Sequence, residues 1–75
     1  MITFEGKQYD DRHGGPFDRG MADSYYRRRF DPHYFVGGTY NTPRVDRESM
    51  TTEELEAYGA GFEYNEDMGD HKDWR

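Results

Sequence analysis

The sequence predicts a small single domain of the α+β class that spans residues 1–75. A chain of this length is enough for one domain and no more. A helix-start signal at Thr51 is followed by apolar residues at helical spacing, which predicts one well-defined helix. Upstream of it, short apolar segments alternate with glycine and proline, a pattern typical of short strands, turns and loops.

The N-terminal residues 2–10 predict a short strand or a two-stranded ribbon. Ile2 and Phe4 lie at a spacing of two and share one face, and Gly6-Lys7 is a turn signal. The next ten residues predict an ordered Gly-rich loop without regular structure, because they contain several strong breakers: Gly14, Gly15, Pro16 and Gly20.

Residues 21–30 predict a short aromatic helix. Asp23 or Ser24 is a suitable N-cap, and the Asp31-Pro32 step ends the helix because a residue before proline disfavours the α conformation. Residues 33–40 then predict an extended segment that is broken at Gly37-Gly38, and residues 41–49 a polar connector.

The clearest local signal predicts an acidic helix over residues 52–66. Thr51 precedes Glu54 by three positions, which is the spacing of a capping box, and Met50 and Leu55 occupy the positions of a hydrophobic staple. One face of the helix carries its apolar and small residues: Leu55, Tyr58, Gly59 and Phe62. Glycine is unfavourable inside a helix, so Gly59 and Gly61 indicate that another element packs closely against it. Residues 69–75 predict a flexible tail.

The core must be aromatic. The only Ile, Val and Leu residues are Ile2, Val36, Val45 and Leu55, whereas Phe, Tyr and Trp make up 17% of the chain. Each large ring can bury roughly 150–250 Å². We expect most of the buried side chains to come from one set of rings: Tyr25, Tyr26, Phe30, Tyr34 and Phe62.

Composition argues against several functions. The chain contains no cysteine, so it has no disulfide scaffold and no cysteine nucleophile. His13, His33 and His71 lack the spacing of a zinc motif, and no phosphate-binding or nucleophile motif is present. We therefore expect no enzyme activity, no metal and no cofactor. No apolar run is long enough for a membrane span, and we expect a cytoplasmic protein that does not bind membranes.

Charge is distributed unevenly. Residues 1–34 hold as many acidic as basic residues, so the net charge of −6 belongs to residues 35–75. The one basic cluster, Arg27-Arg28-Arg29, lies among aromatic residues that could stack on nucleic-acid bases. The acidic balance argues against polyanion binding, and we expect these arginines to pair with acids of the C-terminal half or to contact protein.

Binding to a protein partner is the function favoured by this composition, because Tyr, Trp, Phe, Met and Arg are enriched at interface centres. A nucleic-acid-associated role for the Tyr25–Phe35 segment is the alternative. The candidate partner-binding residues are Tyr25, Tyr26, Arg27, Arg28, Arg29, Phe30, His33, Tyr34, Glu53, Glu56 and Trp74.

The sequence resembles a family of short uncharacterised proteins of tailed bacteriophages. The resemblance lies in Arg12-His13-Gly14-Gly15-Pro16-Phe17-Asp18-Arg19-Gly20, Ala22-Asp23-Ser24-Tyr25-Tyr26, Pro32-His33-Tyr34 and scattered positions between Met50 and Trp74. It implies a host-takeover or counter-defence protein that binds a host protein in the host cytoplasm, or else a minor virion structural protein. Residues 57–62 are also similar to the helix of ribosome modulation factor, but that protein is strongly basic, which argues against ribosome binding here.

Overall fold

The computed structural model describes residues 1–36 and 43–69, and it confirms the α+β class, the N-terminal ribbon and the C-terminal helix. Two helices are accompanied by two pairs of short antiparallel strands. In chain order the elements are β1 (Ile2–Phe4), β2 (Lys7–Tyr9), α1 (Pro16–Tyr25), β3 (His33–Phe35), β4 (Arg44–Asp46), a 3-10 turn (Arg47–Ser49) and α2 (Thr52–Met68).

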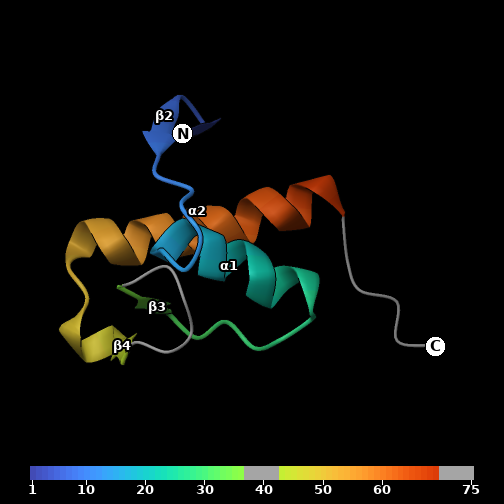
Figure 1. Cartoon of the computed structure of the whole chain (residues 1–75). Coiled ribbons are helices and arrows are strands. Elements are labelled where there is room, and N and C mark those ends of the chain that lie inside the picture. The colour runs from blue at the N-terminus through green and yellow to red at the C-terminus, as the bar shows by residue number, and fades with distance from the viewer. Residues whose placement is uncertain (37–42, 70–75) are drawn as a thin grey trace.

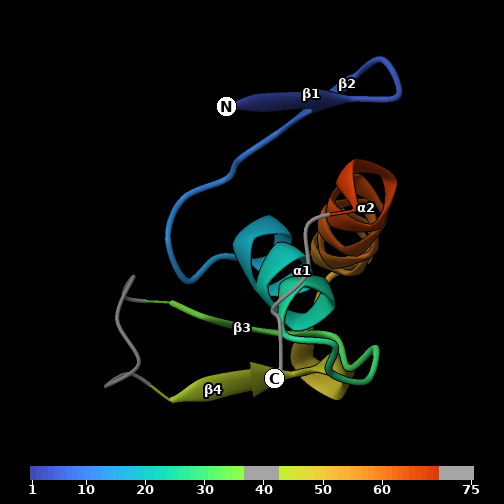
Figure 2. The same cartoon turned by 90° about the vertical axis from the view of Figure 1, so that its right-hand side faces the viewer.

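The two helices lie side by side at the centre of the molecule and run in the same direction (Figure 1). The β1–β2 hairpin lies on one side of the pair and the β3–β4 ribbon on the other (Figure 2). Ile2 pairs with Tyr9 in the hairpin, and His33 pairs with Asp46 in the ribbon. Because the helices are parallel, the chain must cross back between them, and the β3–β4 ribbon belongs to this crossover.

The helices touch backbone to backbone at two glycines. A Cβ on Gly20 would overlap the Tyr58 carbonyl oxygen and lie 2.8 Å from the amide nitrogen of Phe62. A Cβ on Gly61 would overlap the carbonyl oxygen of Phe17 and lie 2.9 Å from its carbonyl carbon. Each helix therefore requires glycine where it crosses the other.

The residues around the two contact glycines follow the same spacing on both helices. Three positions before each glycine lies a ring that is fully buried, Phe17 on α1 and Tyr58 on α2. Four positions after each glycine lies a buried polar residue, and the Asn65 side-chain amide donates to the Ser24 hydroxyl over 2.9 Å. This hydrogen bond satisfies two polar groups that the close helix packing removes from water.

The core is aromatic, as expected, but its members differ from the prediction. The Phe17 ring stacks on Tyr9 at a centroid distance of 5.4 Å, and Tyr58 is fully buried. Tyr26 and Phe30 are exposed, at 37% and 49% of their surface. The other predicted core rings are half-buried: Tyr25, Tyr34 and Phe62. The prediction failed because it placed the first helix too late in the chain.

The predicted loop over 11–20 is confirmed only for residues 11–15, and the predicted helix over 21–30 only for residues 21–25, because the helix begins five residues earlier than expected. Helix α1 begins at Pro16, where the missing amide hydrogen costs nothing because a first-turn amide has no partner within the helix. Gly20 lies inside this helix at the contact with α2. Asp23 and Ser24 are consequently buried interior residues rather than caps.

The segment between the helices also differs from the prediction. The expected extended segment is confirmed for His33–Phe35, whereas the expected connector over 41–49 contains β4 and the 3-10 turn. Gly37-Gly38 and the tail beyond Gly69 lie outside the described residues.

The predicted helix start is confirmed in detail. The Glu54 amide donates to the Thr51 hydroxyl over 3.2 Å, and the Thr51 amide donates to the Glu54 carboxylate over 2.8 Å. Met50 is buried, as the staple requires. The helix continues two residues beyond the predicted end and stops at Gly69, which adopts a left-handed conformation with φ 67°.

We expect Thr51→Ala to lower the free energy of unfolding by about 0.5–2 kcal/mol, because the Glu54 amide loses its acceptor. Chemical denaturation followed by circular dichroism measures this change. Thr52→Ala is the matched control, since Thr52 lies just inside the helix and does not cap it. Equal stability of the two variants would contradict the capping role.

Candidate binding groove and basic turn

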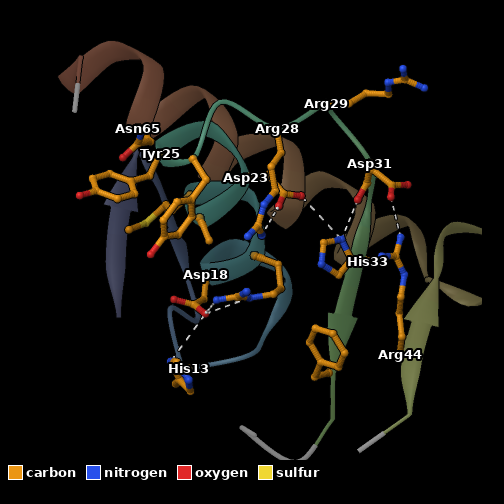
Figure 3. A pocket seen from close by; sticks show the side chains of 15 residues that line it. His13, Asp18, Asp23, Tyr25, Arg28, Arg29, Asp31, His33, Arg44 and Asn65 are labelled. Carbon is orange, nitrogen blue, oxygen red and sulfur yellow. Dashed lines mark hydrogen bonds and ion pairs between the residues drawn. The ribbon is translucent and has the colours of Figure 1, made fainter. Parts of the chain in front are cut away.

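An open groove of about 920 Å³ lies along α1, between the end of that helix and the β3–β4 ribbon. Most of its lining residues carry a charged or imidazole side chain, and Figure 3 shows these side chains converging from several elements. The charged and imidazole side chains are Arg19, Arg28, Arg29, Arg44, Asp18, Asp23, Asp31, His13 and His33.

A buried carboxylate, Asp23, organises the inner part of the groove. Asp23 is only 3% exposed and accepts a hydrogen bond from the Tyr58 hydroxyl. One Arg28 guanidinium nitrogen lies 3.5 Å from its Oδ1, and Nδ1 of His33 lies 3.7 Å from its Oδ2. Burial and the bond to Asp23 together raise the pKa of Tyr58 well above its usual value. Tyr58 thus stays protonated and remains a donor to Asp23.

The same tyrosine fixes the chain that follows α1. The Asp31 amide donates to the Tyr58 hydroxyl oxygen over 3.2 Å. Nδ1 of His33 lies 2.7 Å from the Asp31 carbonyl oxygen, which can only accept, so Nδ1 carries the proton. The chain between Arg28 and His33 is therefore held against the helix pair by polar contacts at both ends.

Three of the four groove arginines are paired with carboxylates of the chain itself. Besides the Arg28–Asp23 pair, Arg19 lies 2.8 Å from Asp18. Arg44 lies 2.6 Å from Asp31 and 2.5 Å from Asp46. The Arg44 hydrogen bond lowers the pKa of Asp31. Within residues 1–36 and 43–69, Arg29 forms no ion pair.

The end of α1 forms a turn that we call the basic turn, Arg27-Arg28-Arg29. The Arg27 amide donates to the Ser24 carbonyl over 3.0 Å, and the Arg28 amide to the Asp23 carbonyl over 2.7 Å. These are the two hydrogen bonds of a Schellman motif, with Arg27 at the left-handed position. Its φ of 58° is unfavourable for a residue with a Cβ, by about 1–2 kcal/mol.

Two exposed rings flank the basic turn. Tyr26 precedes it, and the Arg28 guanidinium carbon lies over the Tyr26 ring at 4.9 Å from its centroid. Phe30 follows it and packs in T-shaped geometry with Tyr58 and Phe62, both at a centroid distance of 5.2 Å. The segment 26–30 therefore presents guanidinium groups and partly exposed rings next to one another.

The structure brings together some of the predicted partner-binding residues. Tyr25, Tyr26, Arg28, Arg29 and His33 line the groove. Arg27 and Phe30 belong to the exposed segment that adjoins it.

Other predicted partner-binding residues lie elsewhere. Tyr34 is half-buried and hydrogen-bonds to Glu54. Glu56 accepts a hydrogen bond from Lys7 and another, over 3.1 Å, from the Tyr9 hydroxyl, so it joins the β1–β2 hairpin to α2. Glu53 is exposed near the start of α2, and Trp74 lies outside the described residues.

Arg28 forms an ion pair within the chain, as expected, but its partner is Asp23 of α1 rather than an acid of the C-terminal half. Prediction also missed the groove carboxylates Asp18 and Asp31 and their partners Arg19 and Arg44. Single charged residues in segments predicted as loops gave no signal, because their roles depend on which segments meet in space.

Among the described residues, no group of three or more His, Asp or Glu side chains is placed to hold a metal ion. His71 lies outside them. Neither helix of the described part of the chain has the length and apolar character needed to cross a membrane. Comparison with protein-family models, with curated proteins and with solved structures finds no match for this chain.

We expect Tyr58→Phe to destabilise the protein by about 1–3 kcal/mol, because the buried Asp23 carboxylate loses a donor and the Asp31 amide an acceptor. Denaturant unfolding measures the change. Tyr64→Phe is the control, since the Tyr64 ring contacts Phe4 and Phe17 and its hydroxyl hydrogen-bonds to none of the described residues. If the two variants lost equal stability, the Asp23 network would not support the fold.

Proposed function

We propose that this chain is a phage accessory protein, without enzyme activity, that binds and modulates a protein of the bacterial host. The binding surface is the basic turn with its flanking rings, Tyr26 and Phe30. One observation carries the proposal: three arginines and two partly exposed rings lie on five consecutive residues, 26–30. Arginine and tyrosine dominate the binding energy of protein interfaces, and phenylalanine is enriched there.

The charge arrangement favours a protein over a nucleic acid as the partner. Arg19, Arg28 and Arg44 already neutralise carboxylates within the groove, so a phosphate backbone would have to compete with Asp18, Asp23 and Asp31. The net charge of −6 also repels a polyanion at longer range. A protein surface that offers carboxylates to the basic turn and apolar groups to the rings suits this mixed surface better.

The same pairing favours binding over catalysis. The groove carboxylates and His33 are engaged in hydrogen bonds or ion pairs that hold the fold, and the groove is open to water. A catalytic acid or base works best in a site that excludes water. The phage and host context, with the host cytoplasm as the compartment, rests on the sequence resemblance described above.

Site-specific photo-crosslinking tests the proposal. A benzophenone amino acid replaces Tyr26 in one probe and Glu63, an exposed residue of α2, in the other. In bacterial host lysate we expect the first probe to give a discrete protein adduct that the second does not give. We expect added protein without the benzophenone group to reduce the yield of this adduct by competing with the probe for the partner. The double variant Arg27→Ala/Arg29→Ala should compete at least tenfold less well. Arg28 is left intact because it pairs with Asp23.

The other functions give different results in the same experiment. An adduct that disappears after nuclease treatment, together with micromolar binding to labelled single-stranded oligonucleotides, would replace the proposal by nucleic-acid binding. If the lysate is made from phage-infected cells, an adduct formed only with phage-particle proteins would favour a minor virion component. If the double variant competed as well as the unmodified protein, the basic turn would not be part of the binding surface.

A further inference from the structure

The β3–β4 ribbon has an open edge along β4. The edge of β3 that faces away from β4 is bonded to the loop before α1, because the Phe35 amide donates to the Gly14 carbonyl over 2.8 Å. Strand β4 lies on the far side of β3 from α1 (Figure 2), and no other strand of the described chain pairs with it. An open strand edge can pair with a further strand, and its side chains determine which strand fits.

The hydrogen bonds of the ribbon determine which backbone groups of β4 lie at this open edge. In an antiparallel pair, hydrogen-bonded residue pairs alternate with pairs that form no mutual hydrogen bonds. The Phe35 amide points away from β4, so its pair with Arg44 is of the second kind. The His33–Asp46 pair, two residues along the ribbon, is of the same kind. The amides of Arg44 and Asp46 therefore point outward, to the open edge.

The side chains of β4 are complementary to those of a second β4. Arg44 and Asp46 are exposed on one face of the strand and carry opposite charges, and Val45 lies between them on the other face. In an antiparallel pair of two β4 strands centred on Val45, each Arg44 lies opposite an Asp46. Opposite charges at such cross-strand positions stabilise the pair, and like charges destabilise it. None of the other three described strands contains both an acidic and a basic residue.

Arg44 can bind a second copy without losing its contacts within its own chain. A guanidinium has five N–H donors, of which Arg44 directs one to Asp46 and one to Asp31, so the other three can bond a carboxylate of a second copy. On the other face, Val45 lies opposite Tyr34 in the ribbon. Pairing brings the two Val45 side chains together, in an apolar row with a Tyr34 at each end.

We propose that two copies of this chain associate through β4, in an antiparallel pair with two-fold symmetry that joins the two ribbons into one sheet. The proposal is independent of the proposed function, because β4 lies outside the basic turn. Arg44 of each copy forms backbone hydrogen bonds with Asp46 of the other copy, and the two Val45 residues lie opposite one another without bonding. A strand of three residues buries little surface, so the dimer is weak and depends on protein concentration.

Charge reversal at the two ends of β4 tests this pairing. Arg44→Asp leaves only acidic residues at the paired positions, and Asp46→Arg leaves only arginines. We expect each variant alone to raise the dissociation constant of the dimer, measured by sedimentation velocity, at least tenfold. An equal mixture of the two variants restores opposite charges at both cross-strand positions, and we expect it to form heterodimers. This rescue also shows that the variants have folded.

A cysteine in the middle of β4 tests the register. The two Val45 Cα atoms of the dimer are expected to lie about 4.5 Å apart, a separation that a disulfide can span. The chain has no cysteine of its own, so Val45→Cys introduces a single thiol. Gln8→Cys is the matched control, because Gln8 is the middle residue of β2, whose sequence is not self-complementary. In a glutathione redox buffer we expect Val45→Cys to form at least tenfold more disulfide-linked dimer than the control.

Several results would overturn the proposal. Unmodified protein that stays monomeric at millimolar concentration, or mixed charge-reversed variants that form no heterodimer, would exclude association through β4. Equal disulfide yields from Val45→Cys and Gln8→Cys would exclude a two-fold pair centred on Val45. A monomeric protein whose benzophenone probe at Val45 crosslinks to another protein of the host lysate would assign the open edge to a strand of that protein instead of a second copy.

Discussion

The close contact between α1 and α2 at Gly20 and Gly61 is the constraint on which the rest of this structure depends. At each glycine the neighbouring helix occupies the space of a Cβ. The approach encloses Phe17 and Tyr58, which are the two rings in the described part of the chain that lose all contact with water. A chain with so few aliphatic residues gains most of its buried apolar surface from such rings, so the glycines determine whether a core can form.

The geometry of the proposed binding surface follows from the same contact. Once Tyr58 is buried between the helices, its hydroxyl meets the Asp23 carboxylate and accepts from the Asp31 amide. These bonds fix the first part of the segment that connects the two helices. Arg28, in the same segment, is held to Asp23 by an ion pair. The exposed segment 26–30 is therefore a turn supported from below by the core. A surface of this kind has its geometry fixed before any binding takes place, which would favour affinity for the proposed partner.

Local signals predicted α2 and the N-terminal hairpin, because both depend on neighbouring residues. Thr51 and Glu54 cap each other, and Ile2 and Phe4 lie at a spacing of two just before the turn. Helix α1 was predicted in the wrong place because Pro16 and Gly20 are breakers in isolation, and only the partner helix makes Gly20 favourable. The spacing shared by Phe17, Gly20 and Ser24 with Tyr58, Gly61 and Asn65 is the signal that could have indicated the contact. The arginines and rings of the candidate site were visible in the sequence, whereas its carboxylate partners depend on tertiary structure.

A comparison of two glycines in α2 tests the central constraint most directly. A Cβ on Gly59 would meet only the Phe30 ring, at 3.9 Å, whereas a Cβ on Gly61 would overlap the α1 backbone. We expect Gly59→Ala to raise the free energy of unfolding by about 0.5–1 kcal/mol through helix propensity. Gly61→Ala gains the same propensity but must separate the helices, so we expect it to lose at least about 3 kcal/mol or to fail to fold. If Gly61→Ala were as stable as Gly59→Ala in chemical denaturation, the helices would not be held together by this contact.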